Sequence, residues 1–266
     1  MLDSSSASLL DELNTKNRLA RMWPGALSLG LVVAFLLYKE RGPLWPVGLA
    51  FGATGVATAL AYWKDELRKS VVLLYDLERE VEAAFEKVCD DFNSLAHSAR
   101  AWHIQASGAV RDQKYEAGAS SLVNRKGASF AKNAPPYVKT NIHVPTISLT
   151  RAKLYFFPDR LLVYGADGVG AVSYKNLQLE VSPSRFIEAE GVPGDTQVVG
   201  QTWQYVNKDG GPDRRFKNNR QIPVVLYEAL HFKSDSGLNE LLQVSRVGVG
   251  EKFREALQGL GHVSQK

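Results

Sequence analysis

Two uncharged apolar runs near the N-terminus constrain this chain more than any other feature of its sequence. The first covers residues 22–38 and the second covers residues 44–63, with a charged turn of Lys39, Glu40 and Arg41 between them. At about 1.5 Å per residue the second run can cross a hydrocarbon core of about 30 Å, and the first lies near the lower limit of about 17 residues. The pattern predicts a transmembrane helical hairpin.

Aromatic and small residues support a hairpin in lipid. Rings that favour the headgroup region stand at the ends of the runs: Trp23, Tyr38, Trp45, Tyr62 and Trp63. Small residues that allow close helix approach recur at four-residue spacing: Gly48 and Gly52, then Ala53, Ala57 and Ala61, with Ala26 and Gly30 on the first run. Three alternatives remain open, namely a secretory signal peptide, a buried hairpin of a large soluble domain, and a re-entrant pair.

The flanking cations predict the orientation of the hairpin. The cations outside the two runs are Lys16, Arg18, Arg21, Lys64, Arg68 and Lys69, whereas the turn has only Lys39 and Arg41, offset by Glu40. The positive-inside tendency then predicts two spans of the inner (plasma) membrane with both termini cytoplasmic. The single cysteine, Cys89, agrees with a reducing compartment, and its neighbours Asp90 and Asp91 disfavour a reactive thiolate.

Helices are predicted on both sides of the hairpin. Residues 1–21 form a juxtamembrane helix, with Ser8 and Asp11 placed as in a capping box. Residues 64–105 lack Gly and Pro, and their apolar stripe predicts a continuous stalk helix about 50 Å long. Part of the stripe has a heptad repeat, which is typical of a coiled coil. The stripe could be covered by a second copy, by the N-terminal helix or by the following domain.

Residues 106–139 interrupt the helical pattern with Ser, Gly and a Pro-Pro pair. The cations of this segment are Arg111, Lys114, Arg125, Lys126, Lys132 and Lys139, and they account for most of the net charge of +4. We interpret the segment as a basic linker, which is either solvated or attracted to an anionic leaflet.

Residues 140–266 read as a β-rich cytoplasmic domain. Strand-like alternation is separated by turns at Pro158–Asp159 and at residues 165–168, and residues 251–260 have helical spacing. The domain resembles bacterial pleckstrin-homology-like (PH-like) domains in four features: RLLVY, the glycine-containing turn, VSYKNLQLEV and the terminal helix. The resemblance covers about half of the chain and implies a small barrel that binds lipids or proteins. A different small barrel or sandwich is the structural alternative.

The loop NKDGGPDRRFKNNR is the most unusual polar stretch of this domain. Five cations within it form a candidate anion-binding site: Lys208, Arg214, Arg215, Lys217 and Arg220. Arginines that converge there could fork onto phosphate oxygens. The alternative is a solvated hairpin tip in which Asp209 and Asp213 pair with the arginines.

Catalytic and metal-binding templates are not recognisable. The five histidines lack metal-ligand spacing, and one cysteine cannot complete a zinc site. GADGVG lacks the Lys and the Ser or Thr of a phosphate-binding loop. We therefore expect no enzyme activity, no catalytic residues, no cofactor and no metal.

The expected protein is α+β: a transmembrane hairpin and amphipathic helix, then a PH-like small barrel with a C-terminal helix. Its expected function is that of a membrane-anchored scaffold or binding protein at the inner leaflet. The expected partners are the bilayer, a protein or a second copy bound through residues 64–105, and an anionic lipid or small anionic ligand, whereas nucleic acid is not expected. The alternative function is a ligand-gated two-helix effector that oligomerises and perturbs the bilayer.

Overall fold

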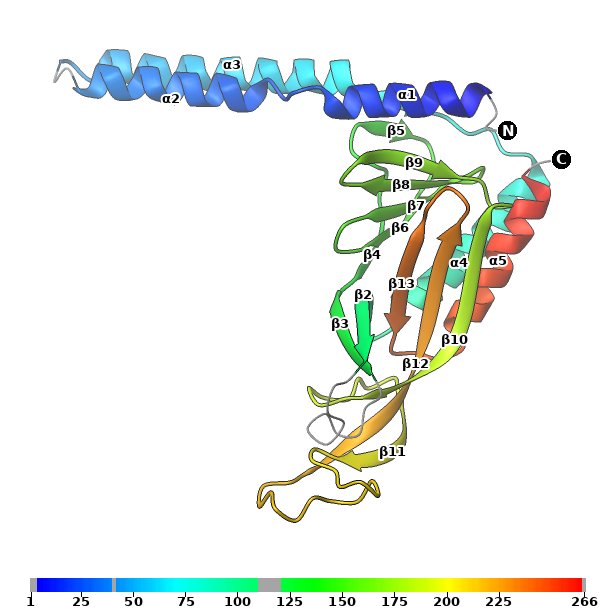
Figure 1. Cartoon of the computed structure of the whole chain (residues 1–266). Coiled ribbons are helices and arrows are strands. Elements are labelled where there is room, and N and C mark those ends of the chain that lie inside the picture. The colour runs from blue at the N-terminus through cyan, green and yellow to red at the C-terminus, as the bar shows by residue number, and fades with distance from the viewer. Residues whose placement is uncertain (1–3, 40–41, 110–120, 265–266) are drawn as a thin grey trace. The chain divides into compact units, whose positions relative to one another are not determined.

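The structure is a computed structural model that describes residues 4–39, 42–109 and 121–264 (Figure 1). The chain divides into two compact units. The first comprises Met1–Tyr75 with Ala134–Ile142, and the second comprises Asp76–Asn133 with His143–Lys266. The chain is α+β, and its sheet-rich C-terminal part ends in a helix.

The first unit is a pair of long helices preceded by a shorter one. Its elements are α1 (Ser4–Arg18), α2 (Trp23–Lys39), α3 (Trp45–Lys69), β1 (Val71–Leu73) and β5 (Val138–Thr140). Helices α2 and α3 lie side by side (Figure 1), and β1 pairs with β5 in parallel. Between the helices, a Cβ placed on Gly30 would lie 2.1 Å from Thr54 Oγ1, so only glycine fits this contact.

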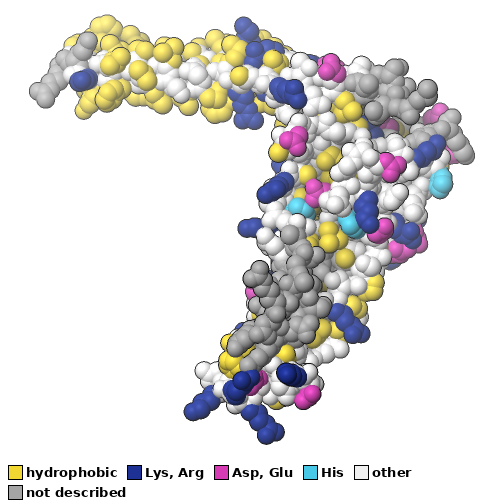
Figure 2. Space-filling view, in the orientation of Figure 1, with side chains coloured by type: hydrophobic (Ala, Val, Ile, Leu, Met, Phe, Trp, Pro, Cys, Tyr) yellow, Lys and Arg dark blue, Asp and Glu magenta, His cyan; other side chains and the backbone are white. Residues whose placement is uncertain are grey.

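Most large side chains of α2 and α3 face outward. Figure 2 shows hydrophobic side chains along this helix pair, and the exposed ones include Leu29, Phe35, Leu49, Phe51 and Leu60. Among the described residues, one helical stretch, Ser8–Lys39, is long and apolar enough to cross a membrane. The predicted second span, in α3, does not meet that measure.

The prediction of one continuous stalk helix over residues 64–105 is wrong. Helix α3 ends at Lys69, where the Ser70 hydroxyl donates to the Glu66 carbonyl at 2.5 Å, and the β-branched Val71 and Val72 then pair with β5. The apolar stripe belongs to a separate helix, α4 (Arg79–Ala96).

The stripe of α4 is covered by the second unit itself. Phe85, Val88, Phe92 and Leu95 are buried, and α4 packs against α5 (Val249–Val263). The Phe92 ring centroid lies 6.0 Å from that of Phe253 on α5. Of the three expected coverings, the following domain is the one observed, and the described contacts provide no support for a coiled coil.

The second unit contains two antiparallel sheets. One has the order β10–β12–β13–β2–β3, with β11 also paired to β12, and the other has the order β4–β6–β7–β8–β9 (Figure 1). The strands are β2 (Ala101–Ala109), β3 (Ser121–Gly127), β4 (Ser129–Lys132), β6 (Pro145–Ser148), β7 (Lys153–Phe156), β8 (Leu161–Gly165), β9 (Gly168–Val172), β10 (Leu177–Ile187), β11 (Gln197–Trp203), β12 (Gln221–Ser234) and β13 (Asn239–Val244). No strand pairing among the described residues closes these sheets into the predicted barrel.

Several local predictions for this unit are confirmed. The chain reverses between β7 and β8 at Pro158–Asp159, and β8 and β9 join through a two-residue turn between Gly165 and Gly168. The predicted C-terminal helix, residues 251–260, lies within α5. These elements follow from local turn chemistry and periodicity.

The linker prediction for residues 106–139 is wrong where the segment is described. The end of β2, all of β3 and β4, and β5 fall within it. Small and polar residues concealed these strands, because backbone pairing with β13 and β6 needs no alternating apolar pattern. Arg111 and Lys114 lie outside the described residues.

Strand β12 serves two packing clusters. Leu230 and Phe232 are buried in the main core, where the Phe232 ring centroid lies 6.2 Å from that of Phe156. Val225 and Tyr227 point to the opposite face and pack with Trp102. The long strand therefore positions a second, smaller cluster on the face opposite the main core.

Candidate functional site

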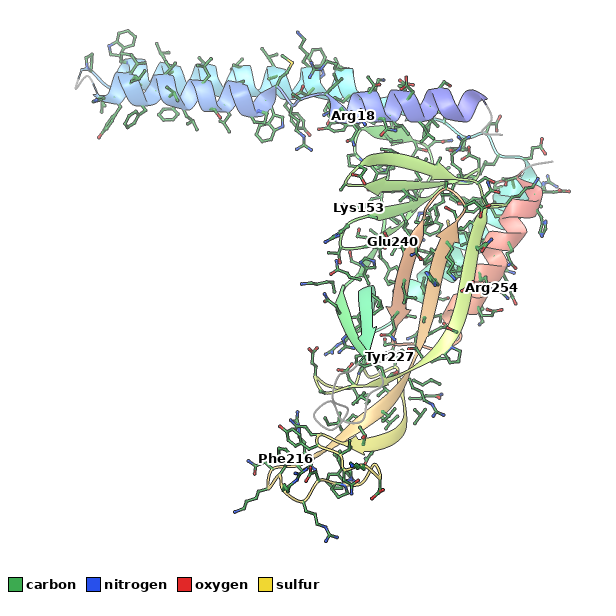
Figure 3. All side chains as sticks on the ribbon, in the orientation of Figure 1. Arg18, Lys153, Phe216, Tyr227, Glu240 and Arg254 are labelled. Carbon is green, nitrogen blue, oxygen red and sulfur yellow. The ribbon has the colours of Figure 1, made fainter. Side chains whose placement is uncertain are left out.

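The candidate anion-binding residues lie in the connection between β11 and β12 (residues 204–220), here named the cationic loop. Its base is braced by aromatic stacking, because the ring centroids of Tyr205 and Phe216 lie 4.1 Å apart and the rings are 16° from parallel. Phe216 is labelled in Figure 3. The Asn219 side chain also accepts from the Tyr205 N–H at 3.0 Å and donates to the Tyr205 carbonyl at 2.7 Å. These contacts hold the two ends of the loop together.

The tip of the loop is a side-chain-supported turn. Asn207 Oδ1 accepts from the N–H groups of Asp209 at 3.1 Å and Gly211 at 2.7 Å. Gly210 has a φ of +80°, a left-handed conformation that glycine adopts without a Cβ clash. The backbone that carries the cations is therefore folded locally.

One of the five predicted cations is paired within the loop. The Arg215 guanidinium donates through Nε at 3.0 Å and through Nη2 at 2.9 Å to the two oxygens of Asp213. Asp213 is buried and also accepts from the Arg215 N–H at 3.1 Å. The predicted Asp–Arg pairing thus applies to Arg215, whose charge is largely compensated.

The other four cations remain available to solvent. Lys208, Arg214, Lys217 and Arg220 are exposed, and no contact in the described chain pairs any of them with a carboxylate. Figure 2 shows dark-blue side chains projecting separately around this part of the second unit. The loop presents a positive surface, and this arrangement suits an extended anion better than a single enclosed phosphate.

A buried ion pair that sequence analysis missed lies in the smaller cluster of the second unit. Arg125 on β3 donates through both terminal nitrogens to Glu188, at 2.8 Å each. The guanidinium carbon lies 4.5 Å from the Trp102 ring centroid and 4.3 Å from that of Phe186. The Tyr227 hydroxyl, labelled in Figure 3, donates to Glu188 at 2.7 Å.

The environment sets the charge states of this pair. Burial alone would raise the pKa of Glu188, but hydrogen bonds from Arg125, Tyr227 and the Glu190 N–H outweigh it, and the pKa is lowered. Burial opposes the Arg125 charge, but Glu188 raises the pKa of Arg125 overall. The pair is therefore ionised and joins β3 to the end of β10.

No local signal could reveal this cluster. Arg125 lies in the segment interpreted as a linker, and Glu188 lies 63 positions away beyond the end of β10. Only the pairing of strands in the order β10–β12–β13–β2–β3 brings the two side chains together.

A second candidate region is the hairpin base, defined as residues 18–23 and 64–69. The buried Asp65 carboxylate accepts from the N–H groups of Met22 at 2.5 Å and Trp23 at 3.1 Å, where α2 begins. Arg68 donates to Asp65 at 3.1 Å and to the Ala20 carbonyl at 2.7 Å. Asp65 thus caps α2 from α3.

Lys69 completes the hairpin base on its other side. Its Nζ donates to the Leu19 carbonyl at 2.7 Å and lies 4.7 Å from the Tyr137 ring centroid. The Arg21 guanidinium carbon lies 6.0 Å from the same ring. Tyr137 holds a φ of +62°, which is uncommon for a non-glycine residue, so the surrounding contacts maintain a strained backbone.

Both ring nitrogens of His103 have structural partners. His103 Nε2 lies 2.6 Å from Glu240, and its Nδ1 accepts from the Thr150 N–H at 3.4 Å. Cys89 is half-buried, and burial raises the pKa of its thiol. Within the described residues, no group of three His, Cys, Asp or Glu side chains is arranged to hold a metal ion.

The chain was compared with protein-family models, with curated proteins and with solved structures. None of the three comparisons finds a match.

Proposed function

We propose that this chain is a membrane-anchored binding protein. Helices α2 and α3 both cross the inner membrane, with both termini cytoplasmic, and the second unit is a PH-like binding module with no catalytic role. The cationic loop captures an anionic ligand near the inner leaflet, and tethering raises the local concentration of the module there.

The observation that carries the anchor is the outward exposure of apolar side chains on both long helices. Leu29 on α2 is 69% exposed and Leu49 on α3 is 64% exposed. At about 1.5 Å per residue, the 17 residues of α2 extend about 25 Å, close to the thickness of a hydrocarbon core. Water would oppose this exposure, whereas lipid acyl chains would cover it.

The architecture of the second unit supports a PH-like module. Antiparallel neighbours β6, β7, β8 and β9 precede β10, β12 and β13, and α5 follows as the last element. Short antiparallel strands followed by a C-terminal helix are the pattern on which the sequence resemblance is based. The exposed, unpaired cations of the loop support anion capture.

Membrane attachment and topology are tested on the full-length chain in cells. The protein is expected to stay in the pellet after carbonate washing and to enter solution with detergent. With Cys89 replaced by Ser, a Gly42→Cys variant should react with an impermeant maleimide in cells with an intact inner membrane. A Ser236→Cys variant should react only after that membrane is permeabilised. Release by carbonate, or the reverse labelling pattern, would contradict the anchor or its orientation.

Anion capture is tested with inositol hexakisphosphate as a dense polyphosphate probe. The variant K208Q/R214Q/K217Q should lose at least about tenfold in affinity, since each lost phosphate contact contributes about 1 kcal/mol or more. The control K126Q/K175Q/K252Q removes the same charge from exposed positions elsewhere in the second unit. An equal loss of affinity in both variants would show that net charge, and not the cationic loop, determines the binding. Calorimetry uses the full chain in zwitterionic detergent, because residues 140–266 alone would lack α4, β2, β3 and β4.

A further inference from the structure

The cations at the hairpin base and beside it fall into two groups. Arg68 is paired with Asp65, Lys69 is buried against the Leu19 carbonyl and Tyr137, and Lys139 lies 3.5 Å from Glu66. Lys16 is paired with Glu12 at 2.7 Å. These side chains are already used to hold the first unit together.

Three further cations lie outside these ion pairs, and of these Arg21 lies 6.0 Å from the Tyr137 ring centroid. Arg18, Arg21 and Lys64 are exposed, and none has a carboxylate partner in the described chain. Arg18 ends α1, as Figure 3 shows, and Arg21 precedes the first residue of α2 by two positions.

The capping contacts place these three cations at the same end of the hairpin. Asp65 binds the N–H groups of Met22 and Trp23, so its neighbour Lys64 lies beside the start of α2. Lys69 binds the Leu19 carbonyl, which follows Arg18 directly. Figure 2 shows Lys and Arg side chains gathered where the hydrophobic surface of the hairpin ends.

Aromatic residues indicate that this end of the hairpin lies at a bilayer interface. Trp63, directly before Lys64, is 62% exposed, and Trp23 begins α2. Amphipathic rings of this kind favour the headgroup region, and long cationic side chains beside them reach lipid phosphates. Because Asp65 already occupies the amide groups at the start of α2, side-chain cations remain as the groups that can bind phosphate.

We propose that Arg18, Arg21 and Lys64 form a binding surface for the headgroups of anionic phospholipids, which selects an anionic leaflet for the hairpin base. This inference rests on the proposed membrane anchor, but it is independent of the cationic loop. Each cation close to an anionic surface contributes about a fivefold preference for an anionic over a zwitterionic lipid at the site that the cation contacts.

The test uses full-length protein reconstituted in phosphatidylcholine vesicles containing spin-labelled phosphatidylglycerol or phosphatidylcholine. Electron paramagnetic resonance measures the fraction of each lipid immobilised by the protein. The wild type should prefer phosphatidylglycerol by about twofold or more on average, since only part of the lipid shell contacts cations. The variant R18Q/R21Q/K64Q should lose most of this preference, while K208Q/R214Q/K217Q should keep it.

Each remaining outcome identifies what fails. Immobilisation of neither lipid would show that the hairpin is not in the bilayer, which overturns the proposed anchor. Equal immobilisation of both lipids by the wild type would overturn the lipid-binding surface and leave the anchor standing. A preference that persists in R18Q/R21Q/K64Q would show that other residues carry it, which also overturns this assignment.

Discussion

The Glu228 carboxylate on β12 accepts a hydrogen bond of 2.6 Å from the backbone N–H of Gly250 in the first turn of α5. The same carboxylate accepts from Gly248 at 3.0 Å and Val249 at 3.1 Å. A buried acid on the sheet thus occupies the amide groups that a helix N-terminus leaves without partners. A Cβ on Gly250 would lie 3.0 Å from Glu228 Oε2, so this residue lets the carboxylate approach closely.

Replacing Glu228 should therefore loosen α5 from the sheet. We expect Glu228→Ala to cost about 3 kcal/mol, because three amide groups, two of them in the buried residues Val249 and Gly250, lose a charged acceptor. Thermal unfolding and hydrogen exchange of the α5 amides measure the effect. The control Glu251→Gln removes an exposed acid paired with Arg254 in the same helix turn, and should cost less than about 1 kcal/mol. Equal costs for the two substitutions would contradict the anchoring role.

Gly30 tests the packing of α2 against α3. Gly30→Ala should destabilise the pair by about 1–3 kcal/mol, because the new Cβ would overlap the Thr54 side chain. Gly52→Ala is the matched control, since nothing lies within 4 Å of its Cβ position. Unfolding by sodium dodecyl sulfate in mixed micelles measures both, and Thr54→Gly should partly restore the Gly30→Ala variant. If both alanine variants unfold at the same detergent fraction, the contact contributes nothing.

The Arg125–Glu188 pair should make the stability of the second unit depend on pH. Because the pKa of Glu188 is lowered in the folded chain, its contribution is fully present above the ordinary Glu value of about 4.3. The contribution is lost as the pH falls through the lower, folded value.

The measurement compares the unfolding of wild type and Glu188→Gln at pH 7 and at pH 3. At pH 7 the variant should lose about 3–5 kcal/mol, because Arg125 keeps its charge without a buried partner. The gap should narrow at pH 3, because below the ordinary Glu pKa the unfolded wild-type chain binds a proton that the ion-paired Glu188 of the folded chain resists, so the wild type loses stability. A gap that is constant over this range would show that the ion pair does not carry the pH dependence.

Local patterns in the sequence were sufficient for several elements. Uncharged runs predict α2 and α3, turn residues predict the β7–β8 and β8–β9 reversals, and apolar spacing predicts α5. The predicted stalk failed at Ser70, where favourable helix spacing on both sides concealed a strand. The side-chain bond from Ser70 to the Glu66 carbonyl and the parallel partner β5 end the helix there.

The candidate sites divide in the same way. The five cations of the loop were recognisable because they are adjacent in sequence, but their spacing could not distinguish Arg215, paired with buried Asp213, from the exposed cations. Arg125 was assigned to a linker because its role depends on an acid on another strand. The unpaired cations of the hairpin base can also be recognised only in the structure, because it shows which other cations pair with Asp65, Glu66 and Glu12.

By itself, the sequence determined helices α2, α3 and α5, the reversals between β7, β8 and β9, and where apolar surface and positive charge accumulate, because these depend on neighbouring residues. Tertiary structure alone decided which charges are neutralised, which apolar stripe is covered and how the sheets are ordered. The physical reason is that ion pairs and strand pairing join residues distant along the chain, and their free energy depends on burial that only folding creates.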